Sequence, residues 1–339
     1  MRDTKVTIKD VAEAAGVSIA AVSNALNGTG RLSEQTRQAI QEVAQRLKFR
    51  PNLMAQALIK KRTLTIGLLT DDTYGRFSFP VMAGISDALV DHGVSVLLAA
   101  VEEDPERARL HVNALLERRV DGLIVSGRRA DRHIPLDLSD ADVPVVYALT
   151  ASPSGSPNIT VDDQDGARIG ADWLLKTGRR DIVHVTGPES HLAARHRAAG
   201  YREAIGKPGR VMHGQWAERW GRQAVAELWS GASPPPDGIT CGSDQIARGV
   251  IDELRERGIK VPEQVGVVGF DNWQIVADAT LPPLTTIDMN LRALGQQAGL
   301  MVLAMSRGEL DTAAEHKIPC TLVVRQSCGG GKPVEGEEV

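Results

Sequence analysis

The residue types that most often carry covalent or metal chemistry do not fall into reactive spacings in this chain. Cys241, Cys320 and Cys328 are an odd number without a Cys-x-x-Cys pair, so neither a disulfide framework nor a zinc site is expected. His191 and His196 lie five residues apart, off a common helical face and without a set of carboxylate ligands. The phosphate-binding P-loop, the Gly-x-Ser-x-Gly elbow and His-Glu-x-x-His are absent from the sequence. We therefore expect binding chemistry, not an enzyme, with no metal and no cofactor.

Basic side chains, which bind polyanions, are concentrated near the N-terminus. Residues 1–62 contain five Lys and six Arg against two Asp and three Glu, a net charge of +6, whereas the remainder carries −10. A basic segment on an acidic body indicates that this segment approaches a polyanion such as DNA. The 339 residues suit two or three domains. Neither a membrane-length apolar run nor a secretory signal is found, which favours a cytoplasmic protein that does not contact the membrane.

Three short helices are expected to position these basic residues. Thr7 can cap the first helix together with Asp10, Gly16 can end it in a left-handed turn, and Ser18 and Ser33 can cap the next two. The inward positions are Ile8, Val11, Ala12 and Ala15, then Val22, Ala25 and Leu26, then Ile40, Val43, Ala44 and Leu47. Two helices joined by a tight Gly-containing turn form a helix-turn-helix. A three-helix bundle without DNA contact is the alternative, which the basic charge disfavours.

From Leu64 onward, short apolar runs alternate with helical patterns, which indicates parallel sheets covered on both faces. The predicted strands are Thr65–Leu69, Val94–Leu98, Gly122–Val125, Pro144–Tyr147, Ile182–Thr186, Gly238–Cys241 and Val265–Phe270, with further segments at Leu284–Ile287 and Cys320–Val324. Two series of this kind predict two α/β lobes. Such sheets bind ligands outside the carboxyl ends of their strands, so candidate residues should follow the strands.

The first sixty residues resemble the opening of the lactose-repressor (LacI/GalR) family in four runs, at 6–18, 21–27, 33–37 and 49–58. The resemblance implies that the second helix enters the major groove and that Ile19, Ala20 and Asn24 read base edges. It also implies phosphate contacts by Thr7, Ser18, Ser23, Asn27 and Thr36. Asn can pair with adenine, so we expect an A·T pair opposite Asn24. The family usually has polar residues at the first two reading positions, and Ile19 could instead pack at the helix start.

Residues 51–62 resemble the family's hinge, which the resemblance expects to become helical on operator DNA. Pro51 should stop the third helix. An isolated helix of two turns is marginal in water, which agrees with ordering only on DNA. Leu58 matches the leucine that wedges between the central base pairs in the minor groove. An ordinary interdomain linker with a buried leucine is the alternative.

The resemblance continues to about Cys328 and implies a two-lobed sensor similar to periplasmic sugar-binding proteins. It assigns effector contacts to Phe77, Ser78, Arg197, Trp216, Ser243, Asp244 and Asp271. A guanidinium fork and a carboxylate suit vicinal hydroxyls, and an aromatic face covers a sugar ring. Purely structural roles are the alternatives: Trp216 in the core, Arg197 paired with an acid on the surface, and Asp271 as a helix or turn cap. The acid that some relatives carry after the fourth strand is missing from Tyr147-Ala148-Leu149-Thr150.

Together these observations predict an all-α helix-turn-helix headpiece (1–50), a hinge (51–62), a two-lobed α/β sensor and dimerisation domain (63–328) and a flexible tail (329–339). The expected function is a transcriptional repressor that binds a pseudo-palindromic double-stranded operator as a homodimer, regulated by a small molecule. A sugar or sugar derivative is the first expectation for that effector and a nucleobase or nucleoside the second. A solute-binding protein without a regulatory role is the other function considered, and residues 1–62 argue against it.

Overall fold

The computed structural model describes residues 6–49, 62–101, 104–206, 208–231, 234–310 and 315–329. The chain divides into two compact units, Met1–Thr63 and Leu64–Val339, which are described separately. Within the described ranges, no helix is long and apolar enough to cross a membrane. The predicted hinge, apart from Arg62, and the predicted tail, apart from Gly329, lie outside the described residues, and so does Leu58.

The described part of the first unit contains the helices α1 (Ile8–Ala15), α2 (Ile19–Asn27) and α3 (Glu34–Arg46). Thr7, Ser18 and Ser33 are the N-cap residues, as the sequence predicts. Gly16 ends α1 with a φ of 65°, a left-handed conformation that glycine adopts without steric cost. The helices enclose a small core of Val11, Ala12, Val22, Ala25, Ile40 and Ala44.

Arg37 fixes the angle between α2 and α3. Its Nη1 donates to the backbone oxygens of Asn24 and Ala25 at 3.2 and 3.3 Å, near the end of α2, where helix carbonyls lack partners within the helix. The two helices therefore present a fixed surface, and the predicted helix-turn-helix is confirmed.

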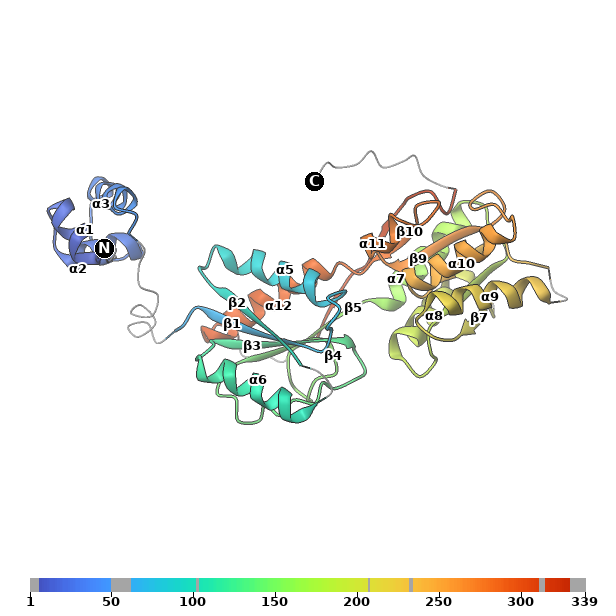
Figure 1. The fold of residues 1–339 in the computed structure, drawn as a ribbon, viewed down its shortest axis with the longest axis horizontal. Coiled ribbons are helices and arrows are strands. Elements are labelled where there is room, and N and C mark those ends of the chain that lie inside the picture. Colours follow the sequence, from blue (N-terminus) through green and yellow to red (C-terminus); the bar gives the residue numbers. More distant parts are fainter. Residues whose placement is uncertain are drawn as a thin grey trace, which may run out of the picture. The chain divides into compact units, whose positions relative to one another are not determined.

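The second unit contains two lobes, each built on a six-stranded sheet (Figure 1). In the first lobe the strand order is β11-β5-β4-β3-β1-β2 and every pair is parallel. The strands are β1 (Thr65–Thr70), β2 (Ser95–Ala100), β3 (Gly122–Arg129), β4 (Val145–Thr150), β5 (Asn158–Val161) and β11 (Glu315–Ile318). Helices α5 (Ser78–Val90) and α12 (Leu291–Ser306) cover one face, and α6 (Pro105–Glu117) covers the other.

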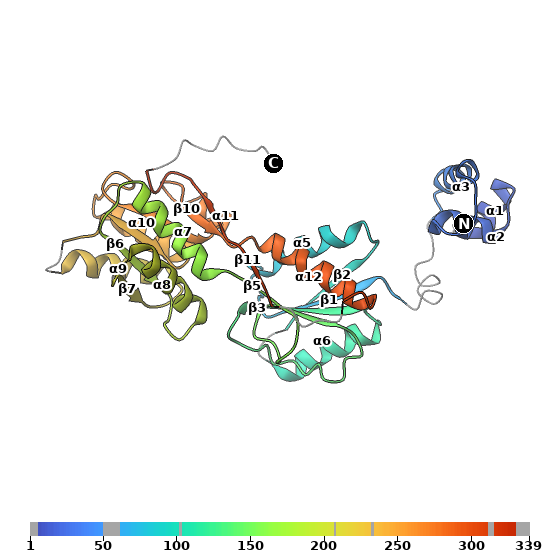
Figure 2. The ribbon, with the colours of Figure 1, turned by 180° about the vertical axis from the view of Figure 1, so that it is seen from behind.

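The second lobe has the strand order β12-β10-β9-β8-β6-β7, with only the β10–β12 pair antiparallel among its described strands. The strands are β6 (Ile182–Thr186), β7 (Arg210–His213), β8 (Gly238–Cys241), β9 (Gly266–Asp271), β10 (Thr285–Asp288) and β12 (Thr321–Val323). The helices are α7 (Asp163–Lys176), α8 (Leu192–Ile205), α9 (Glu218–Ser230), α10 (Asp244–Glu256) and α11 (Gln274–Ala277). The view from behind shows α7 and α8 on the opposite side of this sheet from α9 and α10 (Figure 2).

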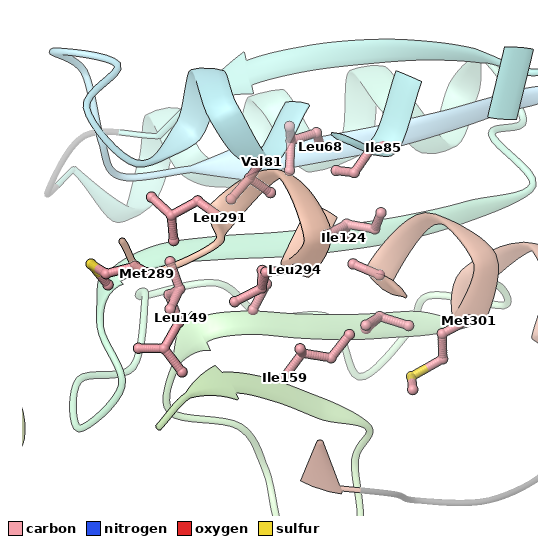
Figure 3. Close-up of a cluster of buried hydrophobic side chains, with 14 of the residues drawn as sticks. Leu68, Val81, Ile85, Ile124, Leu149, Ile159, Met289, Leu291, Leu294 and Met301 are labelled. Atoms are coloured by element: carbon pink, nitrogen blue, oxygen red, sulfur yellow. The ribbon is translucent and has the colours of Figure 1, made fainter. Parts of the chain in front are cut away.

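The chain passes between the lobes three times, from β5 to α7, from β10 to α12 and from β11 to β12. One hydrophobic cluster follows these crossings and includes Ile159 of β5, Met289 between β10 and α12, and Leu294 of α12 (Figure 3). Each fully buried aliphatic side chain of this kind contributes about 1.5–3 kcal/mol. The crossings therefore hold the carboxyl ends of the two sheets near a common seam.

Candidate functional site

The outward face of α2 carries the residues predicted to read bases. Ile19 is 44% exposed and Ala20 is exposed, while Asn24 is half-buried one turn after Ala20. Ile19 is not among the residues that pack against the headpiece core. The Asn24 Oδ1 accepts a bond from the Thr29 hydroxyl at 3.4 Å. A Cβ at Gly30 would lie 2.6 Å from the Asn24 amide nitrogen, so the glycine leaves room for this side chain.

Three of the predicted phosphate-contacting residues take part in local capping. The Thr7 hydroxyl donates to Asp10 at 2.8 Å, the Ser18 hydroxyl accepts from the Ala21 N–H at 3.1 Å, and the Thr36 hydroxyl lies 2.7 Å from that of Ser33. Each hydroxyl has one donor and two acceptor positions, so capping does not exhaust its capacity. Ser23 is half-buried on α2 and is also in polar contact, and the side chain of Asn27 is outside the described part of the chain.

A cavity of about 580 Å³ lies between the two lobes of the second unit. It is lined by residues that follow strands, among them Arg76 and Phe77 after β1, Arg128–Arg132 at the end of β3, and Asp271 at the end of β9. Of the predicted effector residues, it brings together Phe77, Arg197, Trp216, Ser243 and Asp271. Ligands of α/β proteins bind at this edge of a sheet, so the cavity is the candidate effector site.

Arg197 of α8 is buried on the second-lobe side of the cavity. Its Nε donates to Asp163 at 2.8 Å, its Nη1 donates to the Gly242 carbonyl oxygen at 2.5 Å, and its Nη2 lies 2.7 Å from Asp163. The guanidinium carbon lies 3.6 Å from the centre of the Phe270 ring. Arg197 is thus paired with an acid, but the pair is buried and lines the cavity, unlike the surface pair that the structural alternative expects. These contacts orient the guanidinium of Arg197 before any ligand binds.

Asp271 receives cationic side chains from both lobes. Arg76 of the first lobe pairs with its Oδ2, and Nη1 of Arg197 lies 3.5 Å from its Oδ1. The Arg76 Nη1 also donates to Gln245 at 3.0 Å. Asp271 has a φ of 118°, which is strained for a residue with a side chain and costs on the order of 1–3 kcal/mol. The strained backbone presents the carboxylate to the seam between the lobes.

Arg76 crosses that seam between two aromatic rings. Its guanidinium carbon lies 5.0 Å from the centre of the Phe77 ring and 5.2 Å from that of Trp273. Burial lowers the pKa of Arg76 to about 10, which leaves the group charged at neutral pH. Arg76 is not among the residues predicted from the sequence. Its position after the first strand was the available signal, but its partner 195 residues away was not apparent.

Two predicted effector residues lie behind the cavity and do not line it. Asp244 is fully buried, and its carboxylate accepts from the Trp273 N–H at 2.7 Å and from the Thr286 hydroxyl. Burial raises the pKa of Asp244 to about 6. Ser78 is buried at the start of α5, where its N–H donates to Asp72 at 2.8 Å. Both residues support the loops that carry Arg76 and Asp271.

A second contact between the lobes lies at the start of α8. Arg129 forms a two-pronged pair with Asp131 at 3.0 and 3.1 Å, and Asp131 also accepts from the Leu192 N–H at 2.9 Å. Nη1 of Arg129 lies 2.9 Å from His191 Nε2, and Trp216 Nε1 donates to His191 Nδ1 at 2.9 Å. The run Arg128-Arg129-Ala130-Asp131-Arg132 was visible in the sequence as a charge cluster after a strand, but it was not assigned to the site. Leu149 lines the cavity where an acid was sought.

Comparison with known proteins agrees with this arrangement. Residues 7–52 match the family described as bacterial regulatory proteins, lacI family, and residues 171–328 match a periplasmic binding protein-like domain. The chain is 30% identical to the HTH-type transcriptional regulator DegA of Bacillus subtilis (strain 168), over 95% of this chain and 98% of DegA. It is also 30% identical to the lactose operon repressor of Escherichia coli (strain K12), over 95% and 90%. The chain belongs to the LacI family.

Solved structures extend the likeness of this LacI-family regulator to its architecture. A crystal structure of the lac repressor dimer bound to operator and the anti-inducer ONPF matches with a TM-score of 0.70 and 29% identity, covering 96% of this chain and 99% of that chain. A complex of the transcriptional regulator CelR with cellobiose matches with a TM-score of 0.65 and 28% identity, covering 95% and 99%. The predicted fold, a helix-turn-helix headpiece with a two-lobed sensor, is confirmed. The LacI-family chain is a DNA-binding transcriptional regulator.

Proposed function

We propose that this LacI-family regulator is a repressor whose affinity for operator DNA is set by a sugar or sugar derivative bound between its lobes. The observation that carries this proposal is the cavity, whose lining combines an oriented guanidinium (Arg197), an indole (Trp216) and a carboxylate (Asp271). Charge-assisted hydrogen bonds select hydroxyl-rich ligands, and an aromatic face covers the apolar side of a sugar ring. The cellobiose complex of the similar regulator CelR supports this ligand class.

Effector binding would act through the contacts that join the lobes. Arg76 pairs with Asp271 across the cavity, and Arg129 and Asp131 contact His191 and Leu192 on the other side. A ligand seated among these groups changes their partners and therefore the relation between the lobes. Coupling free energies between two sites are typically 1–3 kcal/mol, or about 5–150-fold in affinity. Whether the ligand weakens or strengthens operator binding follows from which arrangement of the lobes it prefers.

We propose that the chain forms a homodimer, because several apolar side chains remain exposed in the single chain. Leu97 and Leu98 are exposed on β2, at the edge of the first sheet, and Val90 is exposed at the end of α5. Ile275 and Leu281 are exposed in the second lobe. Apolar groups on an edge strand favour association, and a two-fold dimer supplies one headpiece to each half of a pseudo-palindrome. The similar lac repressor was solved as an operator-bound dimer.

On DNA, we assign base contacts to Ile19, Ala20 and Asn24, because they share the outward face of α2. Asn24 is proposed to select an A·T pair, and the two apolar side chains to contact thymine methyl groups. The predicted phosphate contacts orient the headpiece without specifying sequence. The wedge role of Leu58 remains a prediction from the resemblance.

The effector site is tested by isothermal titration of the full chain with glucose, cellobiose, lactose and adenosine, followed by operator titrations with each compound that binds. Trp216→Leu should weaken binding roughly tenfold, the loss expected when an aromatic face of about 1.4 kcal/mol is removed. Trp229→Leu is the matched control, because Trp229, like Trp216, is half-buried against the core of the second lobe but does not line the cavity. The proposal is contradicted if Trp216→Leu leaves the ligand affinity unchanged, or if ligand binding leaves the operator affinity unchanged. Binding of adenosine alone would favour the nucleoside alternative.

A further inference from the structure

The cavity between the lobes is unusually rich in cationic side chains for a site that receives a neutral sugar. Five arginines and one lysine line it: Arg76, Arg128, Arg129, Arg132, Arg197 and Lys317. Arg128 and Arg129 are neighbours in the chain, yet both reach the cavity. The pairing of β3 with β4 shifts register between Ser126 and Arg129, and such a bulge redirects successive side chains.

Four of the five carboxylates that line the cavity are paired with these arginines, and the fifth, Glu315, is exposed on β11. Asp71 lies 3.5 Å from Nε of Arg128, and Asp131 is held by both sides of the Arg129 fork. Asp163 and Asp271 are engaged by Arg197 and Arg76, as described above. A guanidinium has five N–H donors and a paired carboxylate takes two of them at most. Donors therefore outnumber acceptors among the groups that remain to meet a ligand, and the acceptors include Glu315 and the buried Oδ1 atoms of Asp71 and Asn158.

His191 adds a second, independent sign of this excess of donors. Its Nε2 lies 2.9 Å from Arg129 Nη1, and its Nδ1 lies 2.9 Å from Trp216 Nε1. Arginine and tryptophan can only donate, whereas a neutral imidazole has a single acceptor nitrogen. One of the two contacts therefore places a donor against a donor, whichever tautomer forms. Burial and the positive charge of Arg129 lower the pKa of His191, which favours the neutral ring, and a protonated ring would have no acceptor nitrogen at all.

We propose that the effector carries an anionic group, a carboxylate or a phosphate, that binds at Arg128 and Arg129 beside His191 and Trp216. The proposal rests on the proposed effector site and names its ligand class, an acidic sugar derivative. Arg128 reaches Asp71 through Nε, which leaves the terminal nitrogens of its fork outside that contact. An anion accepts from several donors at once and could take the bond that His191 cannot accept. A neutral sugar hydroxyl accepts at most two of these donors, whereas a carboxylate or a phosphate accepts more of them.

The test compares compounds that differ only in the anionic group, by isothermal titration of the full chain at fixed ionic strength. The probes are glucose, glucuronate and glucose 6-phosphate, and galactose, galacturonate and galactose 6-phosphate. We expect an acidic form to bind at least tenfold more tightly than its neutral parent, roughly the contribution of one charge-assisted hydrogen bond. The two acidic arms distinguish a carboxylate from a phosphate effector.

Arg128→Met should reduce the preference for the acidic form to near parity, because it removes the guanidinium and keeps an unbranched stem. Arg255→Met is the matched control, since Arg255 is exposed on α10, pairs with Asp252 on the surface and does not line the cavity. It should retain the full preference. Thermal melting of both variants verifies that they fold.

Three outcomes overturn the proposal: a neutral parent that binds as tightly as its acid, an acidic preference that survives Arg128→Met, or no binding by any probe. If a neutral sugar binds and shifts operator affinity, the proposed regulator stands and only the anionic effector is rejected. If acidic forms bind at Arg128 but leave operator affinity unchanged, the ligand class stands and the proposed coupling fails.

Discussion

At the residue scale, His184 of β6 is the most strongly perturbed histidine among the described residues. It is buried, stacks on Tyr201 with ring centroids 5.4 Å apart, and contacts the Thr240 hydroxyl through Nδ1 at 3.0 Å. Burial lowers the pKa of His184 to about 3, below the 6.5 of an exposed histidine. The folded chain therefore binds this proton less readily than the unfolded chain does. Its stability contribution is complete above pH 6.5 and is lost as the pH falls from 6.5 toward 3.

We predict that the free energy of unfolding of the second lobe falls by about 1 kcal/mol more in the wild type than in His184→Gln between about pH 7 and pH 5.5. All five tryptophans lie between residues 173 and 273, so tryptophan fluorescence during urea unfolding reports this lobe. Asp244, whose raised pKa acts in the opposite direction, is present in both proteins and cancels in the comparison. Equal pH dependence of the two proteins would show that His184 titrates normally.

Single residues of the candidate site could be predicted from the sequence where a local motif or the resemblance pointed to them. Arg197, Trp216 and Asp271 do line one cavity. The partners Asp163, Arg76 and His191 were not found, because each acts through a contact with a residue distant in the chain. Asp244 and Ser78 show the converse. The resemblance assigned both to the effector site, but they are buried and bond to neighbouring loops, and the sequence carries no sign of that.

At the scale of elements, the helices and central strands were predictable because they have strong local signals. The three headpiece helices begin at the predicted caps. The strands β5, β7 and β11 were not predicted. They are four residues long, carry polar side chains such as those of Asn158, Arg210 and Glu315, and lie at or next to a sheet edge. An edge strand buries less surface, so it lacks the continuous apolar run by which a central strand is recognised.

Glycines in α12 permit its close packing on α5, and they allow a matched test. A Cβ at Gly295 would lie 2.1 Å from the Val81 carbonyl oxygen, whereas at Gly299 the nearest atom of α5 is 3.4 Å away. We expect Gly295→Ala to lower the unfolding free energy of the first lobe by about 1–3 kcal/mol through overpacking. Gly299→Ala should be neutral or stabilising by up to about 1 kcal/mol. Calorimetry of the two variants measures this difference, and equal effects would contradict the packing.

At the scale of the whole molecule, the two units carry different parts of the proposed function. The first presents α2 on a small fixed core, and the second holds a cavity between lobes that are joined at both sides. Fold class and family followed from the sequence because they rest on long runs of pattern. The chemistry of the cavity did not, because its five arginines come from three separate segments that meet only in the folded chain.

The central claim is that this chain recognises a specific two-fold DNA sequence. The most direct measurement is selection of the purified full chain from a randomised duplex library at near-physiological salt, with and without the sugar panel, followed by sequencing. The account predicts an enriched pseudo-palindrome with a fixed A·T pair opposite Asn24 in each half-site and an enrichment that the effector changes. Binding that remains independent of sequence and merely weakens with salt, under every condition, would contradict it.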